Sequence, residues 1–116
     1  MGMTFALELS PTLAHVPIGG VDVAATQYSV FRSLEAAQCY RIALAIIEVG
    51  SEALVLVHGR VAGIEHAWIS LDDGRIYDPV AHALIDSANY PAVIDHRYTK
   101  AEALAMATKF QTCGPW

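Results

Sequence analysis

The fold follows from residues 64–79, which read IEHAWISLDDGRIYDP. Two runs rich in β-branched and aromatic side chains, Ile64–Leu71 and Arg75–Asp78, flank the turn signal Asp72–Gly74. This pattern predicts an antiparallel hairpin, because a short turn containing glycine joins strands whose side chains alternate between two faces. Pro79 then ends the second strand, since proline has no backbone N–H to donate to a sheet.

The length of the turn decides which side chains share a face of this hairpin. A three-residue loop pairs Leu71 with Arg75 and places Asp78 opposite Trp68. His66 and Asp78 then lie diagonally on one face, about 7–8 Å apart by backbone, within reach of a carboxylate–imidazole hydrogen bond. A two-residue loop would shift the register by one and send Asp78 to the other face. We therefore expect the three-residue loop, with its glycine in the left-handed position.

The segments on either side complete a single α+β domain over residues 1–116, in which a long helix packs on a small antiparallel sheet and a second helix ends the chain. Apolar residues at spacings of three and four predict the first helix, and a Thr–Glu capping box predicts the start of the last. The expected elements are a loop-rich lead-in over 1–27 with a short strand at Thr4–Leu9, a helix over 29–49 ended by Gly50, antiparallel strands within 53–79, a short helical or irregular piece at Val80–Ser87, a solvated loop at Asp95–Tyr98, and a helix over 99–111 that opens with Thr99 and Glu102.

The composition excludes several classes of protein. Of the 116 residues, 54% are hydrophobic and 16% are charged, which excludes a disordered chain. The net charge is −5 and the Lys and Arg residues are scattered, so no basic stripe exists to bind nucleic acid. The longest purely apolar runs, Ile42–Ile47 and Ala53–Val57, fall far short of the roughly 20 residues that a membrane-spanning helix needs. With no signal-peptide pattern either, we expect a cytoplasmic protein.

Three residues in the order Cys39, His66, Asp78 suit thiol chemistry. A thiol with a pKa of about 8.5 is mostly protonated at neutral pH, and a helix N-terminus or a neighbouring imidazolium favours the thiolate. Cys39 would attack, His66 would accept its proton and return it to the leaving group, and Asp78 would fix the histidine tautomer. The backbone N–H of Cys39 would be one oxyanion donor. The second donor is open among Gln38, Gln27 and Tyr28.

These residues stand in a recognisable context. Cys39-Tyr40 lies on a predicted helix, Glu65-His66-Ala67-Trp68 on the next strand, and Tyr77-Asp78-Pro79 at the end of the strand after it. Over residues 36–79 the sequence resembles the transglutaminase-like proteins of the papain-like cysteine peptidase superfamily. In one respect it departs from the papain pattern, because Ser33 occupies the place of the oxyanion glutamine.

The resemblance implies a small thiol-dependent acyl-transfer enzyme with Cys39 as nucleophile, His66 as base and Asp78 as orienting acid. The reaction implied is acyl transfer at an amide of a protein or peptide substrate, by a peptidase, amidase, deamidase or transamidase. It implies neither a metal nor an organic cofactor. Trp68 is then either a core residue or a wall of the cleft.

Other interpretations stay open. Cys39 shares a helical face with Ile42, Ala43 and Ile46, and free cysteine is often core filler, so the chain could be a non-catalytic protein-binding module on the same scaffold. An exposed Cys39 would favour the enzyme and a buried one the binding module. A metal site is a third hypothesis, and its weak sequence signal is His58, His66, His82 and His96. His15 is expected to be a loop residue, and Cys113 is a thiol with no partner by spacing. The polar and aromatic residues at Asp95–Tyr98 could line a site instead of forming a solvated loop. A homodimer is compatible with the apolar composition.

Overall fold

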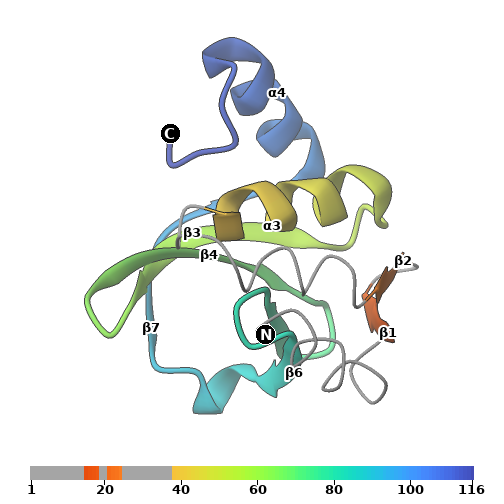
Figure 1. The fold of residues 1–116 in the computed structure, drawn as a ribbon, viewed down its shortest axis with the longest axis vertical. Coiled ribbons are helices and arrows are strands. Elements are labelled where there is room, and N and C mark those ends of the chain that lie inside the picture. Colours follow the sequence, from red (N-terminus) through yellow and green to blue (C-terminus); the bar gives the residue numbers. More distant parts are fainter. Residues whose placement is uncertain (1–14, 19–20, 25–37) are drawn as a thin grey trace, which may run out of the picture.

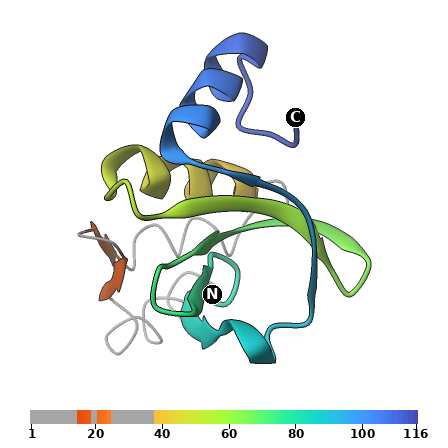
Figure 2. The same cartoon turned by 180° about the vertical axis from the view of Figure 1, so that it is seen from behind.

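The computed structural model describes residues 15–18, 21–24 and 38–116. Five strands form an antiparallel sheet in the order β6-β5-β4-β3-β7, and β1 and β2 form a separate two-stranded sheet. Figures 1 and 2 show the helices α3 and α4 stacked on one side of β3 and β4, with β6 on the other side. The elements are β1 His15–Ile18, β2 Val21–Ala24, α3 Gln38–Val49, β3 Val55–Val61, β4 Ile64–Ser70, β5 Arg75–Asp78, β6 Ala83–Asp86, the 3-10 helix η1 Ser87–Asn89, β7 Ala92–Tyr98 and α4 Lys100–Phe110.

The predicted hairpin is confirmed in register as well as in position. β4 pairs with β5 through Ile69 with Tyr77 and Ser70 with Ile76, and the Leu71 N–H donates to the Arg75 carbonyl over 2.9 Å. This is the register of the three-residue loop. Its glycine has a φ of +88°, in the left-handed region where a side chain would be strained.

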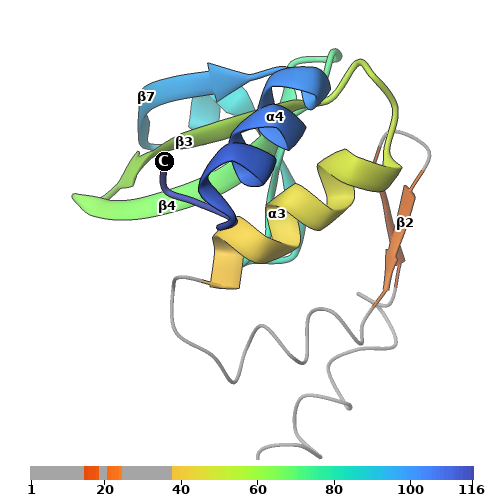
Figure 3. The same ribbon diagram turned by 90° about the horizontal axis from the view of Figure 1, so that it is seen from above.

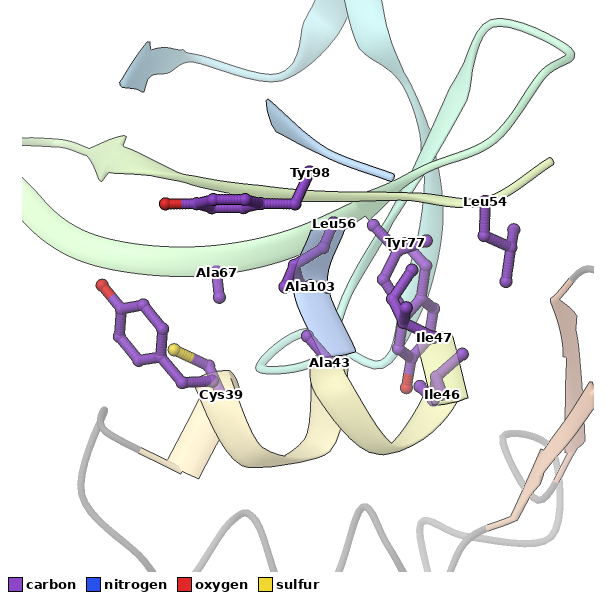
Figure 4. Close-up of a cluster of buried hydrophobic side chains, with 12 residues drawn as sticks. Cys39, Ala43, Ile46, Ile47, Leu54, Leu56, Ala67, Tyr77, Tyr98 and Ala103 are labelled. Atoms are coloured by element: carbon purple, nitrogen blue, oxygen red, sulfur yellow. The ribbon is translucent and has the colours of Figure 1, made fainter. Parts of the chain in front are cut away.

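The core lies between α3 and the sheet (Figure 4). One face of α3 turns Cys39, Ala43, Ile46 and Ile47 toward the strands, and all four are buried. The strand residues that they meet are Leu56, Ala67, Ile69, Tyr77 and Tyr98. At about 25 cal/mol per Å² of apolar surface removed from water, this layer is the main source of stability.

A second, smaller cluster occupies the other face of the same strands. Val57, Trp68 and Ile76 are buried there, and they alternate along the strands with the residues that face α3. Gly59 permits this packing, because a Cβ placed on it would lie 2.8 Å from the Trp68 ring. His66 and Asp78 follow the same alternation as Trp68, so both belong to this face.

The last helix, α4, is fixed at its N-terminal end. Thr99 and Glu102 form the predicted capping box, with Thr99 Oγ1 accepting from the Glu102 N–H and the Glu102 carboxylate accepting from the Thr99 N–H. Lys100 Nζ donates to the Gly50 carbonyl at the end of α3, which ties the two helices together. Figure 3 shows the chain after α4 returning toward the start of α3.

Three sequence predictions are wrong. The segment predicted as helical or irregular, Val80–Ser87, contains strand β6, because β5 offers a free edge and Ile76 pairs with Ile85. The loop predicted at Asp95–Tyr98 is part of strand β7, which pairs with β3.

The third error lies in the lead-in. It contains an antiparallel pair, β1 with β2, in which His15 is a strand residue opposite Ala24. The strand predicted at Thr4–Leu9 and the part of the first helix before Gln38 lie outside the described residues. No helix in the described part of the chain is long and apolar enough to cross a membrane.

Candidate functional site

Cys39 is the second residue of α3 and points into the molecule. Figure 4 shows its sulfur directed toward the strand that carries Ala67. Its side chain has no exposed surface, with a relative exposure of 0%.

His66 and Asp78 meet as the hairpin register requires. His66 Nε2 lies 3.1 Å from Asp78 Oδ1, and both side chains are about nine-tenths buried. The ladder between β4 and β5 holds only the pairs at Ile69 and Ser70 in this part of the structure, so the two strands separate toward His66. The histidine ring can then be reached from the start of α3, and Cys39 is among the groups that raise the pKa of His66.

The ring nitrogens of His66 therefore have separate partners. Because Nε2 faces Asp78, Nδ1 is the nitrogen left for Cys39. Burial alone would lower the pKa of His66, but the hydrogen bonds and the negative charges of Asp78 and Cys39 outweigh it and raise the pKa to about 9. At neutral pH the imidazole is accordingly held in its charged form.

Asp78 is itself fixed from several directions. Oδ1 accepts from the Val80 N–H over 2.7 Å and from the Ala81 N–H over 3.3 Å, which closes a turn directly after β5. Oδ2 accepts from the Tyr90 hydroxyl over 2.5 Å. Burial would raise the pKa of Asp78, but His66, Tyr90 and the Val80 N–H lower it, so this carboxylate is ionised.

Tyr90 is the site residue that sequence reasoning missed. Its ring meets Trp68 edge to face at 5.3 Å, and Trp68 lies 6.0 Å from the His66 ring. Donation to Asp78 and burial together keep the Tyr90 hydroxyl protonated, and burial is the larger cause of its raised pKa. No local pattern marks this residue, since its place beside Asp78 depends on how β6 and η1 fold back.

Trp68 is a core residue, which is one of the two roles considered for it, and the cavity that it lines contains none of Cys39, His66 and Asp78. It is 2% exposed and belongs to the second core cluster. Together with Tyr90, Ile94 and Arg97 it also lines a cavity of about 150 Å³ on that face of the sheet.

The other candidate residues are placed only in part. Gln38 begins α3, and its side chain, like Gln27, Tyr28 and Ser33, lies outside what the structure describes. His58, His82 and His96 do not join His66, and no group of three or more His, Cys, Asp or Glu in the described residues could hold a metal. Cys39 and Cys113 are both free thiols.

Comparison with known proteins adds no relative: no family model, curated protein or solved structure matches this chain.

Proposed function

We propose that this protein is a thiol-dependent acyl-transfer enzyme that acts on amide bonds of a protein or peptide. The observation that supports it best is the His66 ring, whose Nε2 lies 3.1 Å from Asp78 Oδ1 and whose pKa is raised by both Asp78 and Cys39. A histidine held between a carboxylate and a thiol on a helix N-terminus is the arrangement that thiol nucleophiles use. The order helix, strand, strand for these three residues also supports a transglutaminase-like scaffold.

The reaction would proceed in two acyl-transfer steps. His66 would already hold the proton of the thiol as an imidazolium, so Cys39 would react as its thiolate, and the sulfur attacks the carbonyl carbon of the substrate to form a tetrahedral intermediate. Collapse of this intermediate breaks the C–N bond, and His66 gives its proton to the leaving amine, which leaves a thioester on Cys39. Water or a second amine, deprotonated by His66, then attacks the thioester and releases the product and the free thiol.

Asp78 and Tyr90 would act through the histidine. The carboxylate holds the Nε2 proton and stabilises the imidazolium that each proton transfer creates. Tyr90 fixes the second oxygen of that carboxylate, so we assign it as a positioning residue. A cytoplasmic location would suit this chemistry, since a reducing compartment keeps Cys39 as a thiol.

A second candidate function is a non-catalytic protein-binding module on the same scaffold. One observation favours it: the Cys39 side chain is fully buried, whereas a substrate must reach the sulfur.

The first experiment follows the alkylation of Cys39 by iodoacetamide across pH 5–9, with mass spectrometry to separate the two cysteines. Half-buried Cys113 is the internal control in every sample. We expect Cys39 to react faster than Cys113 near pH 6 and to lose this advantage in His66→Ala. A Cys39 that is slow at every pH, or unchanged in the variant, would contradict the enzyme and leave the binding module.

A further inference from the structure

A second pocket lies beside the candidate site, on the α3 side of the sheet. It has a volume of about 260 Å³, and its walls include Tyr40, His58, Glu65, Asp95, Tyr98 and Trp116. Tyr40 follows Cys39 in the helix and Glu65 precedes His66 in the strand, while Cys39 and His66 themselves do not line the pocket. Figure 3 shows how the chain after α4 returns to this region, which is how its final residue, Trp116, reaches the pocket. We call this space the aromatic pocket.

The walls of the aromatic pocket are mainly ring faces and edges. His58 stands at the centre, with ring centroids 4.8 Å from Tyr40, 5.1 Å from Tyr98 and 5.0 Å from Trp116. Tyr98 and Trp116 meet edge to face at 5.1 Å. The π faces of tyrosine and tryptophan attract cations, and the attraction increases when the cation is desolvated.

The electrostatic environment of the pocket is negative. Burial is the main reason that the pKa of Tyr40 rises to about 12, and the negative charges of Cys39, Glu65 and Asp95 add to it. Asp95 is engaged by Arg60, which it binds through both carboxylate oxygens. Glu65 has no ion-pair partner among the described residues, so its charge is available to a ligand.

His58 adds no positive charge to the pocket. Its side chain is 5% exposed. Burial, with a smaller contribution from His96, lowers the pKa of His58 to about 4, so the ring is neutral at pH 7. A neutral imidazole does not repel a cation, and its ring contributes to the aromatic walls.

We propose that the aromatic pocket binds a cationic side chain of the substrate, the guanidinium of arginine or the ammonium of lysine, next to the amide that Cys39 attacks. Both groups carry a positive charge, which matches the aromatic walls and the carboxylate of Glu65. The volume suits one side chain, since pockets for whole ligands usually have about 300–1,000 Å³. The role as a substrate pocket rests on the proposed function, whereas the binding itself does not.

The test is a calorimetric titration of the whole protein with four small amides. N-acetyl-arginine amide and N-acetyl-lysine amide carry the charge, and N-acetyl-citrulline amide and Nα,Nε-diacetyl-lysine amide are their neutral counterparts. We expect the charged compounds to bind about tenfold or more tightly than the neutral ones, a difference of about 1.4 kcal/mol. The stronger of the two cations identifies the preferred side chain. Equal binding of charged and neutral compounds, or no binding at millimolar concentration, would overturn the proposal.

Matched variants locate the binding. Glu65→Gln should weaken the charged compounds several-fold, while Glu48→Gln removes the same charge from an exposed position at the other end of α3 and should change nothing. If Glu65→Gln and Glu48→Gln behave alike, the charge is not recognised in this pocket.

The same titration in Cys39→Ala separates the two proposals. Binding that persists in Cys39→Ala while no acyl transfer is found in the wild type would leave a cation-binding pocket without an enzyme. Acyl transfer at the same rate on arginine and citrulline amides would leave an enzyme without this pocket.

Discussion

The Tyr90 hydroxyl donates to Oδ2 of Asp78 over 2.5 Å, and His66 Nε2 meets Oδ1 of the same carboxylate at 3.1 Å. Tyr90 lies twelve residues after Asp78, beyond β6 and η1, so this bond joins two segments that only the folded chain brings together. The carboxylate that orients His66 is thereby held from the sheet, from the turn after β5 and from the chain that returns toward β7. Such a fixed acceptor holds the imidazole in one orientation, and this is the feature of the site that the following predictions test.

Replacing the thiol distinguishes chemistry from packing. Cys39→Ala should abolish acyl transfer and leave the fold intact, with a loss of stability of about 1 kcal/mol because the sulfur is buried. Thermal unfolding and turnover of a peptide-amide library measure the two effects, and Cys113→Ala is the control that should retain activity. A Cys39→Ala protein that fails to fold would make the sulfur a core group and weaken the enzyme interpretation.

Tyr90→Phe removes one hydrogen bond and keeps the ring against Trp68. Because that bond joins a hydroxyl to a buried carboxylate, its loss should cost about 1–3 kcal/mol of stability. We also expect a several-fold lower turnover and a lower pKa for His66, because a less firmly held Asp78 stabilises the imidazolium less well. NMR titration of the His66 ring measures this, and a purely structural role for Tyr90 would leave that pKa unchanged.

The coupling between Tyr90 and Asp78 has its own measurement. In Asp78→Asn the charge that Tyr90 stabilises is gone, so adding Tyr90→Phe to that variant should cost less stability than it costs in the wild type. Additive effects of the two substitutions on the free energy of unfolding would mean that the bond carries no interaction energy.

The stability of the protein should fall on both sides of neutral pH. His66 has a folded pKa of about 9, above its unfolded value of about 6.5, so its contribution is complete below pH 6.5 and is lost as the pH rises through 9. The pKa of Asp78 is lowered on folding, so its contribution is present above about pH 4 and is lost as the pH falls further. Urea unfolding at several pH values should show the alkaline decline in the wild type and a smaller one in Asp78→Asn.

His58 should produce a separate acid dependence. Its folded pKa of about 4 lies below the unfolded value of about 6.5, so the unfolded chain binds the proton first and stability falls as the pH drops from 6.5 to 4. His58→Phe should remove this decline and stabilise the fold at neutral pH, because an unpaired buried nitrogen disappears. A loss of stability at pH 7 in this variant would show that Nε2 is satisfied in solution.

The parts of the structure that the sequence predicted are those set by neighbouring residues. The turn with its left-handed glycine, the register that pairs Ile69 with Tyr77 and the capping box at Thr99 and Glu102 each depend on a few consecutive positions. β6 and β7 depend instead on distant pairing partners. β7 is also mostly exposed, so its side chains carry no hydrophobic alternation that a sequence could reveal.

The candidate site likewise contains residues that the sequence predicts and residues that it does not. The pairing of His66 with Asp78 follows from loop length and could be predicted, whereas the contribution of Tyr90 requires the path of the chain through η1. The aromatic pocket could not be predicted from the sequence, because its residues Tyr40, His58 and Trp116 come from a helix, a strand and the C-terminal segment. The β1–β2 pair is different, because it could have been predicted. Gly19-Gly20 between two apolar runs is a sequence signal for a hairpin as well as for a loop.

The loop between β4 and β5 offers the sharpest test of the site, because its length alone sets the register. Deleting Asp72 leaves a two-residue connection, which favours a ladder shifted by one residue and turns Asp78 to the other face. The buried positions of Ile76 and Tyr77 oppose this shift, so the variant should be destabilised by several kcal/mol or should abandon pairing at the end of the loop. Either result separates Asp78 from His66, and the His66 pKa should fall from about 9 toward its ordinary value.

Gly74→Ala is the matched control for this deletion. It strains a residue with a φ of +88° by about 1 kcal/mol but keeps the loop length, so the His66 pKa should not change. A deletion variant that keeps both its stability and the raised His66 pKa would show that the register does not position this pair.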